Sequence, residues 1–311
     1  MTVIIPVITG PTASGKSALA LRIAQDRHGV IINADSMQVY DALPLLTARP
    51  DATEQAQAPH RLYAFMAPAQ TCSAAHWADC ALREIATALD NGQTPLIVGG
   101  TGLYLRALMH GLSPIPDIDP AIRARGNALQ RDVGNPAFHA LLEKLDPAMA
   151  ARLHPQDTQR LIRAWEVFTG TGRSLAYWQT LPPVPPVLPD HGPLQFHVTI
   201  FDLPRALLHD RCNRRFDQMI ALGALDETAA LAALIDSGTV PPDAAVSNAL
   251  GFRALRDHLR GTLPLRDAIT QAQAQTRQYV KRQSTWLRHQ IRRDDVPVPP
   301  VTGFTIIDSL P

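Results

Sequence analysis

The stretch Val3-Ile4-Ile5-Pro6-Val7-Ile8-Thr9-Gly10-Pro11-Thr12-Ala13-Ser14-Gly15-Lys16-Ser17 decides the fold of this 311-residue chain. Its first six residues are apolar and mostly β-branched, which predicts a buried strand. Residues 10–17 match the pattern GxxxxGK[ST], in which backbone N–H groups curl around phosphate oxygens, Lys16 neutralises a phosphate and Ser17 can hold Mg²⁺. Apolar residues at helical spacing over 16–27 predict the helix that must follow. The loop indicates a diphosphate or triphosphate ligand without identifying the reaction; the alternative is a tight turn that binds nothing.

Strands and helices continue to alternate after this loop. Residues 30–34 and 95–98 are apolar enough for buried strands, and residues 74–89 between them have helical spacing. Asp35 follows the first of these strands, and Gly99-Gly100-Thr101-Gly102 follows the second. This alternation is typical of a parallel sheet covered on both faces, with ligands at the carboxyl ends of the strands. We therefore expect an α/β fold with a P-loop NTPase-like parallel sheet flanked by helices.

The pattern changes after residue 112. Residues 120–177 have helical spacing throughout, and the proline-dense stretch 182–186 follows them. A strand pattern over 196–201, long helical patterns over 204–293 and an apolar run over 304–307 come next. We expect the first part of the core over 1–115, an all-helical insertion over 116–189, and a return to the core with basic C-terminal helices over 190–311.

Composition excludes several classes of protein. With 46% hydrophobic and 18% charged residues, the chain is neither disordered, collagen-like nor a small disulfide scaffold. It has no run of 18 apolar residues and no basic segment at its start, so we expect a soluble, cytoplasmic protein with no membrane contact. The three cysteines lack CxxC spacing, which favours reduced structural thiols over a reactive cysteine. Without a surplus apolar heptad, we expect a monomer.

Positive charge is concentrated late in the chain. The whole sequence has a net charge of +1, whereas residues 253–293 contain 10 Lys and Arg against two acids, a net charge of +8. Such a stretch indicates a surface that attracts anions, nucleic acid included. A solvated basic face with no partner is the plainer alternative.

Asp35 is the acid best placed for chemistry. Most nucleotide hydrolases put an acid at the end of an apolar strand to hold their metal, yet the strand over 95–98 ends in Gly99-Gly100-Thr101. The comparable acid is Asp35, at the end of the strand after the phosphate-loop helix, where a general base is well placed. Metal ligation and helix capping remain alternative roles for this carboxylate.

Several further motifs resemble, in order, those of bacterial tRNA dimethylallyltransferases. They are Asp35-Ser36-Met37-Gln38-Val39-Tyr40, Thr47-Ala48-Arg49-Pro50, Pro59-His60, Val98-Gly99-Gly100-Thr101-Gly102-Leu103-Tyr104, Gln159-Arg160-Leu161-Ile162-Arg163-Ala164-Trp165-Glu166-Val167, Arg215-Phe216 and Thr276-Arg277-Gln278-Tyr279-Val280-Lys281-Arg282-Gln283-Ser284-Thr285-Trp286. The resemblance implies transfer of a dimethylallyl group from dimethylallyl diphosphate to N6 of the adenosine at position 37 of tRNA, just 3′ of the anticodon. The phosphate loop then holds a prenyl diphosphate instead of ATP.

The resemblance also implies roles for individual residues. Asp35 accepts the N6 proton as general base, and Thr101 contacts the diphosphate and the transfer site, although a plain turn threonine is the alternative. The diphosphate site consists of Gly10, Pro11, Thr12, Ala13, Ser14, Gly15, Lys16, Ser17 and Arg215, with Mg²⁺ held at Ser17. Arg215 shares a helical face with Arg211, and a surface ion pair is its alternative role.

A base inside a folded anticodon loop must be extruded while the surrounding phosphates are gripped. The tRNA contacts that the resemblance implies are Asp35, Ser36, Met37, Gln38, Thr101, Arg123, Gln159, Arg160, Leu161, Ile162, Arg163, Arg277 and Lys281. Aromatic residues interleave with basic ones in the late helix, which is the composition of an RNA-binding surface. Trp165 is expected in the insertion core instead of stacking on a base.

The chain departs from the family pattern in two places. His60-Arg61 stands where relatives often have two histidines, and no cysteine follows Cys212, so we expect no zinc. Three rival functions stay open: a nucleotide kinase-like phosphotransferase, a P-loop RNA-binding protein without catalysis, and a prenyltransferase of free adenine nucleotides. The last would not need the insertion or the basic helices.

Overall fold

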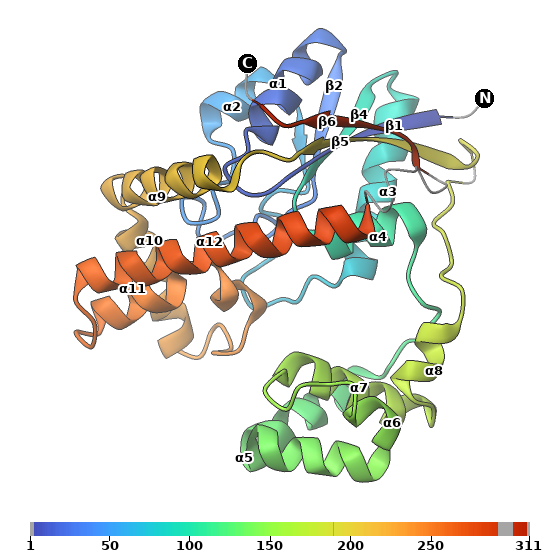
Figure 1. Cartoon of the computed structure of the whole chain (residues 1–311), viewed down its shortest axis with the longest axis vertical. Helices are drawn as coiled ribbons and strands as arrows, with labels where there is room; N and C mark the ends of the chain where they lie inside the picture. The colour runs from blue at the N-terminus through green and yellow to red at the C-terminus, as the bar shows by residue number, and fades with distance from the viewer. Residues whose placement is uncertain (1–2, 189, 292–300, 310–311) are drawn as a thin grey trace. The chain divides into compact units, whose positions relative to one another are not determined.

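The computed structural model describes residues 3–188, 190–291 and 301–309 (Figure 1). The chain divides into two compact units. The first comprises Met1–Met109 and Pro186–Pro311, and the second comprises His110–Pro185. Each has its own hydrophobic core.

The first unit is built on one parallel sheet. Its strands are β1 (Val3–Thr9), β2 (Gly29–Asn33), β3 (His60–Arg61), β4 (Thr94–Gly99), β5 (Leu194–Phe201) and β6 (Val301–Ile307). They lie in the order β3-β2-β4-β1-β5-β6, and every neighbouring pair is parallel. The expected α/β fold with a parallel sheet flanked by helices is confirmed.

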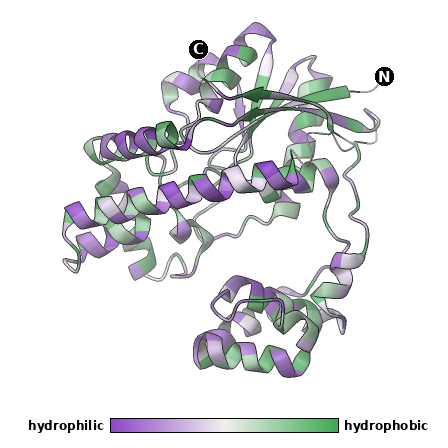
Figure 2. Cartoon of the chain, viewed as in Figure 1, coloured by the Kyte–Doolittle hydropathy of each residue, from purple (hydrophilic) through white to green (hydrophobic). Residues whose placement is uncertain are grey.

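Side-chain alternation buries both faces of this sheet. On β4, Leu96 and Val98 join the core cluster that contains Ala20 and Ala24 of helix α1 (Lys16–Asp26). Ile97 between them points to the opposite face, since successive residues of a strand alternate, and it is also fully buried. Helix α3 (Ala74–Asp90) packs against β2 and β4 as well. In Figure 2 the strands are mostly green, as burial on both faces requires.

Further helices complete the first unit. They are α2 (Ala52–Gln57), α4 (Gly102–His110), α9 (Arg205–Ala221), α10 (Ala224–Asp236), the 3₁₀ turn η1 (Ala245–Asn248), α11 (Phe252–Leu259) and α12 (Leu265–Gln290). The long helix α12 packs against both α9 and α11. Its buried residues Ala268, Ala272 and Val280 lie on one side, which leaves the basic side chains for the other.

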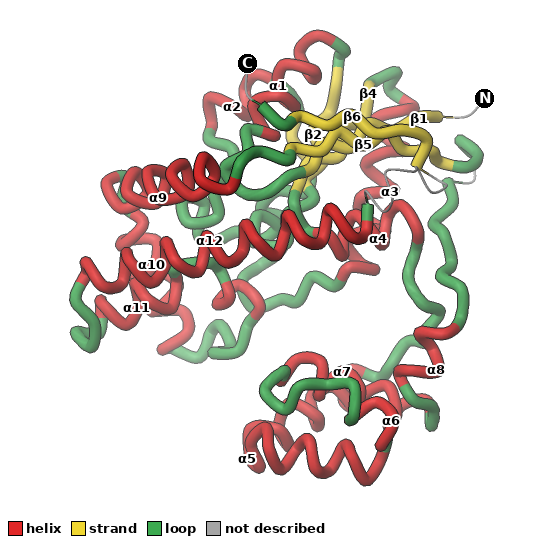
Figure 3. Tube along the Cα trace, viewed as in Figure 1, coloured by secondary structure: helices red, strands yellow, loops and turns green. Residues whose placement is uncertain are grey.

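The second unit is helical, as Figure 3 shows by its red and green tube. Its helices are α5 (Pro120–Leu145), α6 (Pro147–Ala150), α7 (Thr158–Thr171) and α8 (Leu175–Thr180). They bury a cluster of apolar side chains that includes Phe138, Leu142 and Val167, and Trp165 packs against it. Helix α5 is kinked at Gly134, whose φ of 74° is left-handed, two residues before Pro136.

The observed unit begins at His110 and ends at Pro185, whereas we expected an insertion over 116–189. The difference lies in the two segments that connect this unit to the first one. Leu112 and Val184 form an antiparallel bridge, so the chain entering the unit pairs with the chain leaving it. Polar and proline-rich composition identified these segments as linkers but could not reveal that they pair.

No single helix in the described residues is long and apolar enough to cross a membrane. Helices α9 and α10 taken together have the length and the apolar composition of a membrane span, but they are bent by 72° at the break between them.

Candidate active site

Three loops meet at the carboxyl edge of the sheet. The phosphate loop follows β1, residues 34–38 follow β2, and residues 100–102 follow β4. Because β4 lies between β1 and β2, with Thr9 opposite Gly99 and Asn33 opposite Val98, the three strands end at nearly the same level. The topology thus brings together the loop, Asp35 and Thr101, as the sequence predicted.

The ends of β2 and β4 are joined very closely. Ala34 N donates to Val98 O at 2.8 Å, and Thr101 N donates to Ala34 O at 3.1 Å. A Cβ added to Gly99 would lie 2.2 Å from the backbone of Ala34, so only glycine fits there. The Thr101 side chain reaches the same segment, because Oγ1 accepts a hydrogen bond from Ser36 N at 2.9 Å. Both backbone and side chain therefore fix Thr101 beside Asp35.

The Asp35 carboxylate has a fixed orientation. Its Oδ1 accepts a hydrogen bond from Met37 N at 2.9 Å, the turn that aspartate makes with its own backbone two residues on. Asn33, fully buried, holds the turn from the other side: its Oδ1 accepts from Asp35 N at 2.9 Å and its Nδ2 donates to Asp35 O at 3.1 Å. Trp77 of α3 donates to Asn33 O at 2.8 Å. Sequence reasoning missed Asn33, although an amide two residues before a strand-end acid was a usable signal.

The phosphate loop carries the positive charge of the site. Burial lowers the pKa of Lys16 from 10.5 to about 8, with Asp35 opposing that shift and Arg215 adding to it. The pKa of Arg215 is also lowered, chiefly because burial removes its guanidinium from water. In the described part of the chain, Ser14 Oγ is buried without a hydrogen-bond partner. Two desolvated cations and an unpaired hydroxyl around one loop are suited to an anionic ligand.

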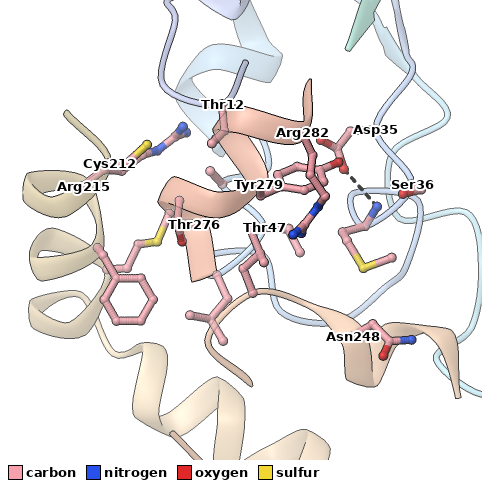
Figure 4. A pocket seen from close by; sticks show the side chains of 16 residues that line it. Thr12, Asp35, Ser36, Thr47, Cys212, Arg215, Asn248, Thr276, Tyr279 and Arg282 are labelled. Carbon is pink, nitrogen blue, oxygen red and sulfur yellow. Dashed lines mark hydrogen bonds between the residues drawn. The ribbon is translucent and has the colours of Figure 1, made fainter. Parts of the chain in front are cut away.

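A cavity of about 200 Å³ opens beside these loops (Figure 4). Its polar lining includes Thr12, Asp35, Ser36, Arg215 and Arg282, and its apolar lining includes Met37, Leu46, Phe216, Met219 and Leu250. Tyr279 of α12 enters it next to Asp35, as Figure 4 shows. The pKa of the Tyr279 hydroxyl is raised, mainly by burial and additionally by the negative charge of Asp35. The cavity therefore has a cationic end and an apolar wall.

One wall of the cavity is a loop over residues 43–49. Gln38 Nε2 donates to Thr47 O and Ala48 O, both at 2.9 Å. Glu227 of α10 accepts from Leu45 N at 2.6 Å and from Leu46 N at 3.2 Å. Gln38 is predicted to contact tRNA; in the structure its amide nitrogen holds this wall, and Gln38 does not line the cavity.

The predicted tRNA residues of the second unit cluster on α5 and α7. Arg163 Nη1 lies 2.7 Å from Glu166 Oε1, and Arg123 Nη1 lies 4.0 Å from Glu166 Oε2. The Glu166 side chain is 5% exposed, against 38% for Arg163 and 45% for Arg123, so a buried acid holds two accessible cations. Arg160 pairs with Asp157 at the start of α7. Sequence reasoning missed Glu166.

The three remaining predicted residues of α7 differ in exposure. Gln159 is exposed, and Ile162 is half-buried. Leu161 has no exposed surface and belongs to the core of the unit, so its predicted contact with RNA is not available in this structure. Its position on α7, one turn before Ala164 and Trp165, explains the burial, because an amphipathic helix must turn one face inward.

The predicted cations of α12 have different surroundings. Arg277 Nη1 donates to Asn213 Oδ1 of α9 at 2.8 Å, which ties its guanidinium to a neighbouring helix. Lys281 is exposed and lines an open groove of about 670 Å³ with Gln278, Arg282, Thr285, Trp286, His289 and Gln290. Basic, amide and aromatic groups in one open groove are suited to a nucleic-acid backbone and its bases.

Comparison with known proteins gives consistent results. Residues 38–290 match the family model described as IPP transferase. A tRNA dimethylallyltransferase of Paramagnetospirillum magneticum is 52% identical over 285 residues, which cover 92% of this chain and 88% of that protein. The crystal structure of tRNA isopentenylpyrophosphate transferase from Bacillus halodurans aligns with a TM-score of 0.63 and 32% identity, covering 97% of this chain and 89% of the other. A eukaryotic dimethylallyltransferase acting on tRNA, 24% identical, shares the fold with a TM-score of 0.75, covering 99% of this chain and 74% of its own.

Proposed function

This chain belongs to the IPP transferase family, and we propose that it is a tRNA prenyltransferase: it transfers a dimethylallyl group from dimethylallyl diphosphate to N6 of adenosine 37 in tRNA. The products are N6-isopentenyladenosine and diphosphate. The family assignment confirms the resemblance of the motifs.

The observation that carries this proposal is the composition of the 200 Å³ cavity. Its lining includes Thr12 of the phosphate loop and Arg215, the polar residues Asp35 and Ser36, and apolar residues such as Met37 and Phe216. A five-carbon group attached to a diphosphate needs a cationic cradle next to an apolar wall. This combination of cationic and apolar lining is suited to the diphosphate and the five-carbon chain of a prenyl diphosphate.

Asp35 and Thr101 have the chemistry that the transfer requires. The N6 nitrogen attacks the allylic carbon, the carbon–oxygen bond breaks, and diphosphate leaves with the electron pair. The Asp35 carboxylate takes the proton that N6 loses, since it lines the cavity in a fixed orientation. Thr101, held against Ser36, lies at the neighbouring strand end, where its hydroxyl can contact the diphosphate.

The leaving diphosphate is stabilised by positive charge. Lys16, Arg215 and the loop N–H groups supply it from the protein. Ser17 stands at the start of α1 with an exposed hydroxyl, an oxygen ligand of the kind that Mg²⁺ accepts alongside phosphate oxygens and water. We therefore assign Mg²⁺ to Ser17; when bound, it supplies further charge to the departing oxygens.

We assign the contacts with RNA phosphates to cations that are accessible to solvent. Arg123 and Arg163 in the second unit, and Lys281 in the groove on α12, are the strongest candidates for phosphate contacts. A prenyltransferase of free nucleotides needs neither set. Their presence supports polymeric RNA as the acceptor.

The experiment is a transfer assay with purified protein, Mg²⁺ and radiolabelled dimethylallyl diphosphate. Unmodified tRNA with adenosine at position 37, the same tRNA with guanosine there, and free AMP are the three acceptors. We expect label in the first alone. Label in AMP would assign the protein to free-nucleotide prenylation, and consumption of ATP without any label would restore the kinase-like alternative.

A further inference from the structure

The side chain of Gln283 on α12 lies buried between two loops of the site. It is 5% exposed. Its Oε1 accepts a hydrogen bond from Thr12 N at 2.9 Å, and its Nε2 donates to Gly100 O at 3.1 Å. Thr12 belongs to the phosphate loop, and Gly100 immediately precedes Thr101. One amide group thus connects the proposed diphosphate site with the proposed transfer site.

An amide side chain is suited to making both contacts. The phosphate loop presents an N–H and the β4 loop presents a C=O, so the bridging group must accept at one atom and donate at the other. A carboxylate accepts only, and lysine or arginine donates only. The fit is also close, because a Cβ added to Gly100 would lie 2.3 Å from Gln283 Nε2.

The same face of α12 contacts the other strand-end loops. Tyr279, four residues earlier, enters the cavity beside Asp35. Trp286, three residues later, packs so closely on Gly102 that an added Cβ would lie 2.3 Å from its ring. Residues three and four apart share a helix face, so this one stripe meets the loops after β1, β2 and β4.

We infer that Gln283 is a positioning residue for the transfer reaction. By joining Thr12 to Gly100, it fixes the position of the phosphate loop relative to Thr101. It thereby also fixes the distance between the leaving diphosphate and the residues that act on the acceptor. Misplacement of reacting groups by about 1 Å can cost roughly 10²-fold in rate. The inference rests on the proposed function, since it takes residues 10–17 as the diphosphate site.

Gln283→Met tests the inference, because methionine has a similar length and makes neither hydrogen bond. We expect the single-turnover rate of transfer to saturating tRNA to fall about 10²-fold. The dissociation constant of dimethylallyl diphosphate should rise several-fold, while that of tRNA stays within about twofold. Ser284→Ala, the neighbouring residue on the same helix, is the matched control and should behave as wild type. Gln283→Glu keeps the acceptor for Thr12 N but loses the donor to Gly100 O, so it should be defective too.

Two results would overturn the inference. One is an unchanged rate and unchanged diphosphate affinity in folded Gln283→Met. The other is weaker tRNA binding with normal diphosphate affinity, which would place Gln283 on the RNA-binding surface. If wild-type protein itself fails to bind dimethylallyl diphosphate, the proposed function is wrong, a failure that the wild-type titration identifies on its own.

A double-mutant cycle provides an independent measurement should Gln283→Met not fold. Gly100→Ala brings a methyl group against Gln283 Nε2 and should reduce the rate. In a Gln283→Ala background the closest clash is removed and Gly10 O, 3.0 Å from the added Cβ, is the nearest remaining atom, so the two changes together should cost less than the product of their separate effects. Independent, multiplicative effects would show that the contact between Gln283 and Gly100 does not position the site.

Discussion

The Thr101 hydroxyl accepts a hydrogen bond from Ser36 N at 2.9 Å and donates one to Ser36 Oγ at 3.3 Å. The ends of β4 and β2 are therefore joined by a side chain as well as by their backbones. Thr101 is more than a turn residue, because its hydroxyl holds the segment that carries Asp35.

Replacing Thr101 by valine removes both hydrogen bonds at nearly constant volume. We expect about 1 kcal/mol less stability, because Ser36 N loses its partner in a half-buried setting. Transfer should slow by about 10²-fold if the hydroxyl also contacts the diphosphate. Thermal melts and single-turnover rates measure the two effects separately. Thr101→Ser keeps the hydroxyl and should retain most activity; a defect in Thr101→Ser with normal activity in Thr101→Val would assign the effect to the methyl group instead.

Asp35→Asn separates the role of the Asp35 carboxylate as a base from its role in holding the turn. Asparagine can still accept the hydrogen bond from Met37 N, so the loop should keep its shape. It cannot take a proton, and turnover should fall by roughly 10²–10⁴-fold with little change in tRNA affinity. Asp35→Ala should lose the same activity and some stability besides. Wild-type turnover in Asp35→Asn would remove the carboxylate from the chemistry.

The sequence was sufficient for most of the sheet and for the gathering of the loops, although it did not predict the short strand β3. Apolar runs and a glycine-rich motif are local signals, and parallel strands necessarily end at one edge. It is less accurate at the end of α1: a glycine just after a helical pattern predicts the stop of that helix, whereas Gly29 is the first residue of β2, where a Cβ would lie 2.9 Å from Ala24 Cα. Glycine is there for close packing, and His28 adopts the left-handed conformation instead.

Contacts between distant segments could not be predicted from sequence. Glu166 has the sequence signature of an ordinary helix-surface acid, yet it is buried beneath Arg123 and Arg163. Gln283 lies between Arg282 and Ser284 in a motif that the resemblance associated with RNA, yet it faces the phosphate loop. In both cases the deciding fact is which side of a helix another element covers, and periodicity does not identify that element.

Arg163→Ala should weaken tRNA binding and destabilise the second unit. The first effect follows from losing an accessible cation, and the second from leaving Glu166 buried with only the more distant Arg123. Adding Glu166→Gln should restore stability but not RNA affinity. Thermal melts and filter binding distinguish the two effects. If stability and affinity recover together, Arg163 serves folding alone.

Lys281→Ala should flatten the salt dependence of tRNA binding. Each lost phosphate contact reduces the slope of log K against log salt by somewhat less than 1. The affinity for dimethylallyl diphosphate should not change, because Lys281 lines the groove and not the cavity. Arg277→Ala should have a smaller effect on this slope, since its guanidinium is bound to Asn213. Binding titrations at several salt concentrations test this ranking, and the reverse order would contradict it.

The pH dependence of diphosphate binding should follow Lys16. Burial lowers its pKa from 10.5 to about 8, so the free enzyme loses this positive charge as pH rises through 8. A bound diphosphate favours the charged form, which means that binding above pH 8 must take up a proton. The dissociation constant should therefore be flat below pH 7 and rise toward tenfold per pH unit above pH 8. Lys16→Arg, whose charge persists, should bind with a nearly constant affinity over the same range. Titrations of dimethylallyl diphosphate from pH 6 to 10 test this prediction. An equal rise of the dissociation constant in wild-type protein and in Lys16→Arg would assign the pH dependence to another group.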